Sequence, residues 1–278
     1  MAIIPQFKVY LPETITILVH GLSDSGKTVL GSCSPDLDPK EPILIEDAVV
    51  LDVEGGTVSL PTRGAGIITG RYPEDPFQVI HSKEDLGKAI DYVRQNKGRL
   101  RYATLDTLDR FQEYALDTIL KENNRTLPEQ RDWLAVLLAL ERFGRTVPTW
   151  GVNVVVLAHS DEAKDDNDKV VKLLPNIRGQ FKSKIGSYFD VVAYLERKIN
   201  PDGSEKRILY TKGTTRYFAR SRLGSCLPSV IDNPTIPALI QDYLDRRSKL
   251  IETLRKNPRV QIVGREPEPS VPPTKPKA

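Results

Sequence analysis

Short apolar runs alternate along this chain with polar stretches that carry apolar residues at helical spacing. Eight runs are predicted to be strands by their length and composition: 15–20, 48–53, 77–81, 102–106, 152–158, 190–196, 207–212 and 216–219. Strands that alternate with helices are typical of a parallel sheet covered on both faces. The pattern therefore predicts an α/β fold with a mainly parallel, twisted sheet and helices on both sides.

Four helices are predicted between and after these strands. The first follows residues 82–85, which have the pattern of a capping box, and two more are predicted at 108–121 and after 126–128. The third carries Trp133 on its apolar face, where the simplest role is in the core. The last helix, 236–256, follows the predicted sheet.

One domain over residues 1–261 is the expected organisation, because 278 residues with 39% hydrophobic content can bury a large single core. From residue 262 onward the chain is rich in proline and poor in apolar residues. Such a composition cannot bury enough surface to fold, so 262–278 is predicted to be a disordered tail. No internal repeat is evident.

The composition of the chain indicates the kind of compartment in which the protein works, but it says little about its activity. The net charge is only +3, so overall charge does not indicate a polyanionic partner. The two cysteines, Cys33 and Cys226, lack metal-ligand spacing and are too few for a disulfide framework, which suits a reducing compartment. No run is long enough to span a membrane and the first residues do not resemble a signal peptide. We expect a soluble protein in the cytoplasm, that of a bacterial host if the chain is phage-encoded.

The strongest chemical signal follows the first predicted strand, where Gly21-x-x-x-x-Gly26-Lys27-Thr28 matches the phosphate-binding loop of P-loop NTPases. Backbone N–H groups of such a loop cradle phosphate, Lys27 should reach the β- and γ-phosphates, and the Thr28 hydroxyl should ligate Mg²⁺. A glycine-rich turn could match by accident, but the preceding strand and the helix-compatible residues that follow favour the functional interpretation. ATP and Mg²⁺ are the cofactors implied. The variable positions of the loop are Leu22, Ser23, Asp24 and Ser25.

Two further predicted strands end in carboxylates. Glu54 follows the strand 48–53 and is a candidate to polarise the attacking water, although a strand-end acid can also be simply solvated. Asp106 ends the strand 102–106, the pattern that holds Mg²⁺ directly or through water. Behind a P-loop, we interpret Asp106 as the Walker B acid.

His159 is the first polar side chain after the very apolar strand 152–158. At that height beside the P-loop strand, a polar group can hydrogen-bond the γ-phosphate and respond to its loss. A single histidine is more often structural, and neither His20 nor His81 is assigned a role.

The order of these motifs resembles the RecA-like ATPase core, in which a catalytic glutamate follows the second strand and a polar sensor ends the strand after Walker B. The chain is most similar to compact bacteriophage RecA-like ATPases of single-strand annealing recombination, over about residues 9–230. The stretches 174–179 and 217–228 carry the more family-specific part of the resemblance. RecA has glutamine where this chain has His159, so the sensor is assigned by position.

The resemblance also implies an oligomer, a ring or a filament. In RecA-like oligomers a Lys-x-Lys or Lys-x-Arg pair enters the neighbouring subunit's nucleotide site, and Arg220-Ser221-Arg222 lies at the matching position. Alternation on a strand would place both arginines on one face. We therefore expect Arg220 and Arg222 to act in trans as arginine fingers; an ordinary solvated face is the alternative.

Single-stranded DNA is the partner implied by the segment after the sensor strand, about 160–187. Its first half is acidic, so the contact is placed on the second half, where basic side chains surround an aromatic one. The residues expected to bind DNA are Arg178, Phe181, Lys182 and Lys184. A weaker candidate is the loop with Lys121, Arg125 and Arg131, and either charge run could be a solvated face.

These observations predict a Mg²⁺-dependent ATPase that oligomerises and binds single-stranded DNA in phage-type recombination, annealing or replication. A single-strand-binding or replication protein is a candidate further partner. Two alternatives stay open: an ATP-driven helicase core or helicase loader, and a nucleotide-gated adaptor that binds a protein and turns over little. A small-molecule kinase is disfavoured, because no arginine-bearing lid segment is evident near the loop.

Overall fold

The computed structural model describes residues 7–32, 48–55, 68–69, 83–164, 170–179, 181–257 and 259–263, and the structural statements below refer to these. The predicted strand 77–81, Cys33, His81 and the tail from 264 onward lie outside the described residues. No described helix is both long and apolar enough to cross a bilayer.

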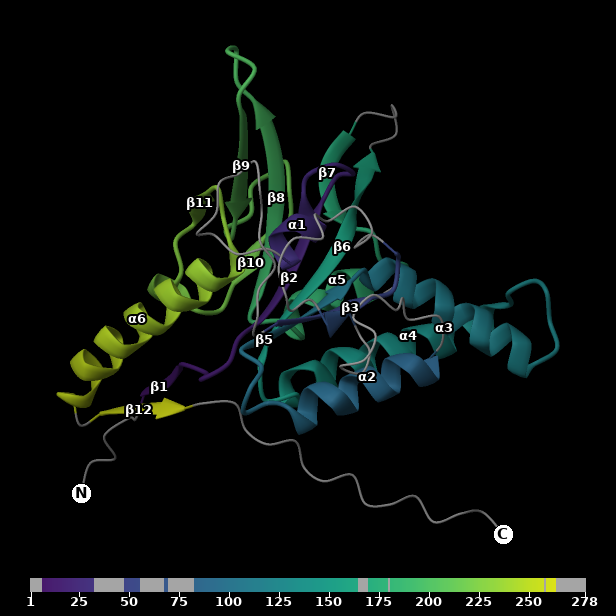
Figure 1. Ribbon diagram of the computed structural model, residues 1–278, viewed down its shortest axis with the longest axis horizontal. Helices are drawn as coiled ribbons and strands as arrows, with labels where there is room; N and C mark the ends of the chain where they lie inside the picture. Colours follow the sequence, from purple (N-terminus) through teal and green to yellow (C-terminus); the bar gives the residue numbers. More distant parts are fainter. Residues whose placement is uncertain are drawn as a thin grey trace, which may run out of the picture.

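The described strands form one large mixed sheet and a small two-stranded one (Figure 1). The large sheet has the order β11-β9-β8-β2-β6-β5-β3-β4, with β10 beside β8 and β7 beside β6. Neighbours from β8 through β4 are parallel, and the remaining pairs are antiparallel. The α/β prediction with a mainly parallel sheet is confirmed. The strand bounds are β2 Thr16–Gly21, β3 Ala48–Asp52, β4 Ile68–Thr69, β5 Tyr102–Asp106, β6 Asn153–Lys164, β7 Val170–Pro175, β8 Val191–Ile199, β9 Glu205–Tyr210, β10 Arg220–Ser221 and β11 Val230–Asp232.

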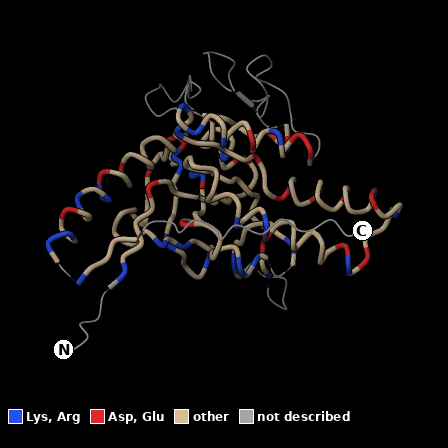
Figure 2. Tube along the Cα trace, turned by 90° about the horizontal axis from the view of Figure 1, so that it is seen from below, with Lys and Arg blue, Asp and Glu red and all other residues tan. Residues whose placement is uncertain are grey.

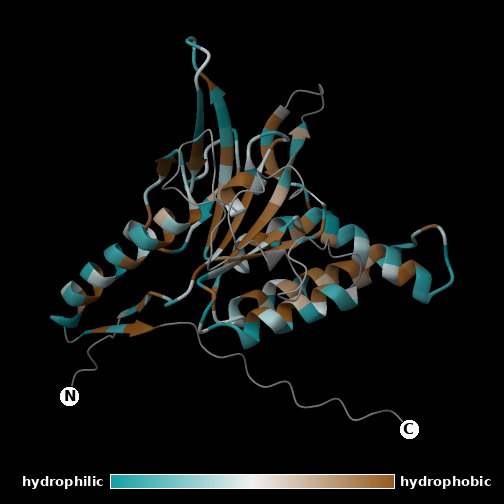
Figure 3. Cartoon of the chain, viewed as in Figure 1, coloured by the Kyte–Doolittle hydropathy of each residue, from teal (hydrophilic) through white to brown (hydrophobic). Residues whose placement is uncertain are grey.

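Helices cover both faces of this sheet because successive strand residues point in opposite directions. On β2, Leu18 packs into a core shared with α2 (Lys83–Gln95), α3 (Leu108–Glu122) and α4 (Gln130–Thr146). Its neighbours Ile17 and Val19 pack into a second core with α1 (Lys27–Ser32) and α6 (Ile236–Arg255). Where the central strands β2, β6 and β8 pair in parallel, they are accordingly mainly apolar (Figure 3).

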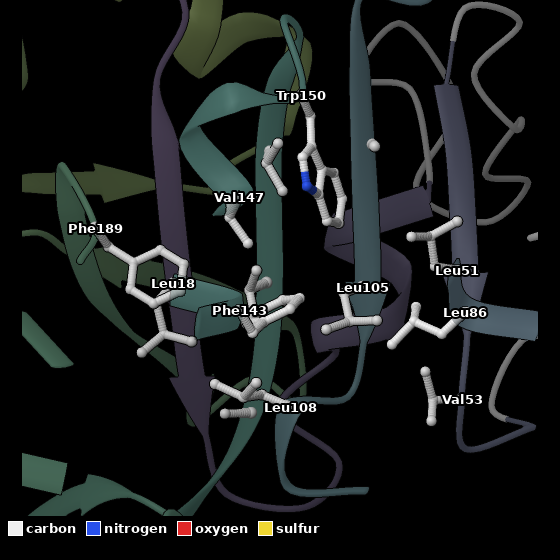
Figure 4. Close-up of a cluster of buried hydrophobic side chains, with 14 of the residues drawn as sticks. Leu18, Leu51, Val53, Leu86, Leu105, Leu108, Phe143, Val147, Trp150 and Phe189 are labelled. Atoms are coloured by element: carbon white, nitrogen blue, oxygen red, sulfur yellow. The ribbon is translucent and has the colours of Figure 1, made fainter. Parts of the chain in front are cut away.

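The first core is built around large buried apolar side chains (Figure 4). Trp150, which is fully buried, meets the Phe143 ring edge-on with centroids 6.1 Å apart. Trp133, predicted as a core residue, is only partly buried, and the Arg178 guanidinium lies over its ring at 5.1 Å. The core assignment of Trp133 was therefore only partly right.

Several predicted boundaries differ from the structure: β8 ends three residues past the predicted 190–196, and β9 lies two residues before the predicted 207–212. Residues 216–219 are not a strand: Tyr217 makes a single bridge to Leu173, and the strand is β10. Strand β6 continues past residue 158 because its end pairs with β7 in a hairpin. At the carboxyl end, β12 (Val260–Val263) pairs in parallel with β1 (Phe7–Tyr10), so residues 262 and 263 belong to a strand and not to a tail.

His20 joins β2 to two other segments. Its Nε2 donates to the Phe218 carbonyl at 2.7 Å, so Nδ1 is left to accept from the Ser160 hydroxyl at 2.8 Å. Burial is the main reason that the pKa of His20 is lowered to about 4, with Lys27 acting in the same direction and the Phe218 bond opposing both. His20 is thus a neutral structural residue, consistent with assigning it no catalytic role.

This burial predicts a pH-dependent stability. Unfolded His20 takes up a proton as the pH falls through 6.5, whereas folded His20 resists protonation down to about pH 4, so stability is full above pH 6.5 and is lost below it. Between pH 7 and pH 5 the contribution of His20 should fall by about 2 kcal/mol. Urea unfolding at both pH values should show a steeper loss in wild type than in His20→Asn, and equal losses would contradict the prediction.

Candidate functional site

The predicted site residues converge at one edge of the sheet. Gly21 pairs with His159 in the register of β2 and β6, and Asp52 pairs with Asp106 in the register of β3 and β5. All four strands are parallel, so their carboxyl ends meet at this edge. The structure therefore brings the P-loop, Asp106, the strand-end acids Asp52 and Glu54, and His159 together.

The P-loop has the backbone shape its glycines allow. A Cβ on Gly21 would lie 2.7 Å from the Leu195 carbonyl oxygen, and Gly26 has a φ of 87°, in the left-handed region. The loop folds around the Lys27 ammonium, which donates to the carbonyls of Gly21 (3.1 Å) and Leu22 (2.9 Å). Burial lowers the pKa of Lys27, while nearby carboxylates, Asp106 first among them, oppose that shift.

Thr28 and Asp106 form the second part of the site. The Thr28 hydroxyl donates to Asp106 Oδ2 at 2.7 Å, and the other carboxylate oxygen, Oδ1, is buried with no hydrogen-bond partner. Burial is the main cause of the raised pKa of Asp106, about 7, with the Thr28 bond acting in the opposite direction. A hydroxyl beside a carboxylate with a free oxygen fits Mg²⁺, which prefers oxygen ligands and would stabilise the ionised acid.

Asp52 shapes the turn that presents Glu54. Its Oδ1 accepts the backbone N–H groups of Glu54 (3.2 Å) and Gly55 (2.7 Å), and so caps the turn after β3. The Glu54 side chain is 41% exposed and faces the site edge, where it reaches His159 Nε2 at 3.9 Å. An exposed carboxylate at this position can accept a proton from water.

His159 is held by a residue that sequence reasoning missed. Asp109, in the first turn of α3, accepts His159 Nδ1 at 2.7 Å and the His159 backbone N–H at 3.1 Å. The bond to Asp109 is the main reason that the pKa of His159 is raised. The sequence signal that could have identified Asp109 is the predicted helix that begins just after Asp106. The first turn of such a helix must lie at the same edge of the sheet as the end of the strand.

A second missed residue is Arg207 on β9. A Cβ on Gly26 would lie 2.4 Å from Arg207 Nε, so this guanidinium lies directly against the P-loop. The Nε atom is buried and has no hydrogen-bond partner. The hairpin of β8 and β9 extends past the end of β2, which is why a residue so far along the chain reaches the loop.

The residues predicted to bind DNA are placed less favourably. Phe181 is fully buried and stacks on Tyr188 with centroids 5.0 Å apart, so its predicted role in stacking a base was wrong. Lys182 is paired with Asp161 at 2.7 Å, and Lys184 with Glu141 at 3.2 Å. These carboxylates partly neutralise the two lysines. Arg178 lies over a tryptophan ring, as described above.

The weaker DNA candidate is also neutralised in part. Arg125 pairs with Glu129 and Asp132, and Arg131 pairs with Glu129. Acidic and basic residues are interspersed along the described chain (Figure 2). Charge distribution alone therefore does not mark a DNA surface.

Arg220 and Arg222 lie away from their own P-loop. Arg220 pairs with Val192 near the start of β8, toward the sheet edge opposite Lys27. Both arginines are exposed beside the turn 185–187: Arg222 Nη2 donates to the Ser187 carbonyl at 2.8 Å, and a Cβ on Gly186 would lie 3.3 Å from Arg220 Nη1. Strand β10 ends at Ser221 and does not include Arg222. The alternation of side chains along a strand therefore does not place the two arginines on one face; both lie beside the turn 185–187 instead.

Comparison with known proteins agrees with this geometry. The profile of one family, described as AAA domain (AAA_24), matches residues 13–223, which span the P-loop strand through Arg222. No curated protein matches the chain. Since the match covers well over half of the sequence and the P-loop, Walker B and strand-end acids meet in one site, the chain belongs to the AAA domain family of P-loop ATPases.

Proposed function

We propose that the protein is a Mg²⁺-dependent ATPase that hydrolyses ATP with Glu54 as the group that activates water. The observation that carries this proposal is the pairing of two halves at one sheet edge. Lys27 and the Thr28–Asp106 pair form one group of contacts, and Glu54 with His159 forms the other. A γ-phosphate bound between them would have a cation behind it and an acceptor for the water's proton in front.

Each residue then has a distinct task in the reaction. Lys27 leaves the loop carbonyls and binds the β- and γ-phosphate oxygens. Glu54 accepts a proton as the water oxygen bonds to the γ-phosphorus and the bond to the β–γ bridging oxygen breaks. Thr28 and Asp106 would hold Mg²⁺, which when bound neutralises charge on the phosphates. His159 Nε2 donates to a γ-phosphate oxygen.

Oligomerisation is the second part of the proposal. Arg220 and Arg222 are exposed and lie away from their own P-loop, as residues that serve a neighbour's site must. Arg207, in contrast, lies against the loop of its own chain. We therefore assign the trans-acting role to Arg220 and Arg222, in a ring or a filament.

Single-stranded DNA is the partner we propose, in phage-type recombination, annealing or replication. The support is positional: β6 carries His159 and continues into the hairpin with β7, and the segment with Arg178, Lys182 and Lys184 follows directly. A ligand on this segment would act on the strand that carries the sensor. With Phe181 buried, the proposed contact is electrostatic and without base stacking by that ring.

The first test measures ATP turnover with and without single-stranded DNA, together with the mass in solution with a non-hydrolysable ATP analogue. Stimulation by DNA and a nucleotide-dependent larger species are expected. Unwinding of a forked duplex would instead favour the helicase alternative. Tight ATP binding with negligible turnover would favour a nucleotide-gated adaptor, for which the apolar groove between α3 and α4, lined by Phe111, Tyr114 and Leu138, offers a protein-binding surface.

The proposed DNA interface makes a quantitative prediction. Replacing Lys182 and Lys184 together by alanine should weaken single-strand binding and lower the log–log salt slope by up to roughly 1.4, about 0.7 for each phosphate that the protein ceases to neutralise. The pairing with Asp161 and Glu141 makes this value an upper limit.

The matched control removes two exposed lysines near the carboxyl end of α6, Lys249 and Lys256, which should leave the slope unchanged. Binding is measured by fluorescence anisotropy over a salt series. A slope that stays at the wild-type value in the Lys182/Lys184 variant would place the DNA interface on another surface.

A further inference from the structure

The Asp109 carboxylate accepts two hydrogen bonds from His159. One carboxylate oxygen accepts the imidazole Nδ1 and the other accepts the backbone N–H of the same residue. Two bonds from one carboxylate fix both the position of the strand and the rotation of the ring. The opposite ring atom, Nε2, consequently points to the Glu54 carboxylate, 3.9 Å away.

This arrangement also selects the protonation of the ring. Because a carboxylate only accepts, Nδ1 must carry hydrogen, and any second proton is held by Nε2 on the side of the site. Three charged groups face the imidazole from the elements around it: Asp109 from α3, Glu54 from the turn after β3, and Lys27 from the P-loop helix. Asp109 and Glu54 favour the charged ring, and Lys27 opposes it.

We infer that Asp109 is a positioning residue for ATP hydrolysis: it holds His159 as an imidazolium whose Nε2 hydrogen faces Glu54 in the resting site and donates to the γ-phosphate when ATP binds. The inference rests on the proposed function and deepens it. Glu54 is restrained by His159 before nucleotide binds, and it becomes free to accept from water once the γ-phosphate takes its place.

The same bond connects the site to the β6–β7 hairpin. His159 continues into Ser160 and Asp161 of the hairpin, and its carbonyl accepts the Asn176 N–H at 2.7 Å from the other side. Asp109 therefore fixes the strand at the point where the hairpin begins. A ligand that displaces the hairpin would have to strain or break the hydrogen bonds between His159 and Asp109.

The experiment compares three variants with wild type. Asp109→Asn keeps the shape of the side chain but removes its charge, and Asp109→Glu keeps the charge. Asp117→Asn is the matched control, because it removes a carboxylate from the same helix, about 12 Å further along the axis.

Direct titration of His159 is the first readout. The chain has only three histidines, so histidine-selective NMR resolves the imidazoles, and His159→Gln assigns the signal. In Asp109→Asn the midpoint of His159 should move to lower pH, because the Asp109 bond is the main cause of its raised pKa. Asp117→Asn should leave the midpoint in place, and Asp109→Glu should restore it at least in part.

Hydrolysis is the second readout. If the imidazolium is the active form, activity falls as the pH rises through the pKa of His159. In Asp109→Asn this falling limb should move to lower pH, and kcat on the alkaline side of the wild-type limb should drop about tenfold with little change in KM.

The outcomes separate this inference from the proposed function. An unmoved His159 midpoint in Asp109→Asn, or an equal movement in Asp117→Asn, overturns the positioning role. A moved midpoint with an unmoved falling limb in the rate profile overturns its part in hydrolysis. If wild type does not hydrolyse ATP, the proposed function fails. The inference can then be tested with a non-hydrolysable ATP analogue and Mg²⁺. This analogue should shift the His159 NMR signal in wild type but not in Asp109→Asn. The absence of a shift in wild type would overturn the inference.

Discussion

Replacing Lys27 by alanine is expected to abolish tight ATP binding, whereas Glu54→Gln should leave binding intact and slow turnover at least about 100-fold. The distinction follows from the two environments. The Lys27 ammonium lies inside the P-loop and meets charge that is already present on bound ATP. Glu54 is exposed beside His159 and matters when water attacks, so its removal affects kcat.

Calorimetric titration with an ATP analogue and a phosphate-release assay measure the two effects separately. Lys121→Ala and Glu252→Gln are matched controls, because both side chains are exposed and lie outside the site. Near-normal turnover in Glu54→Gln would remove Glu54 from the catalytic assignment. Unchanged ATP affinity in Lys27→Ala would show that the loop binds nucleotide differently from the proposal.

Mixing two inactive variants is expected to restore ATP hydrolysis. Arg222→Ala should bind ATP normally and hydrolyse it slowly, since a missing arginine finger commonly costs about 10³-fold or more. Lys27→Ala lacks the P-loop cation but keeps Arg222. In a mixed oligomer, the Arg222→Ala subunit supplies the intact loop and its Lys27→Ala neighbour supplies the arginine, so some interfaces regain a complete site.

A second mixture provides the control. Lys27→Ala combined with Glu54→Gln should stay inactive, because both residues are proposed to act in their own subunit's site and no subunit in the mixture carries both of them. The assay is phosphate release after demonstrated subunit exchange. If the Lys27→Ala and Arg222→Ala mixture is as inactive as its components, Arg222 does not serve a neighbour.

Sequence pattern was sufficient for those features that are local in the chain. Strand β2 and the P-loop follow from one continuous apolar run and its glycines, and Asp106 and His159 each follow directly on the apolar part of a strand. The parallel arrangement then brings these positions to one edge without further information. The α/β class and the meeting of these residues could therefore be predicted.

Other features depend on packing between distant segments. Phe181 looks like an aromatic residue among lysines, but its burial is decided by packing against Tyr188 and the helices beyond it. Asp109 and Arg207 carry no motif, and only the start of α3 and the length of the β8–β9 hairpin bring them to the site. The pairing of β12 with β1 joins residues more than 250 positions apart, which no local composition reveals.

The strand order has a consequence for how the chain acquires its fold. Strand β2 is flanked by β6 and β8, so both of its partners are separated from it by more than 130 residues. During synthesis the apolar strand β2 therefore stays unpaired until β6 and β8 have left the ribosome. Such non-local pairing slows folding and exposes strand edges to association. Refolding should therefore be slow and sensitive to protein concentration, and nucleotide should be able to assist only its last steps.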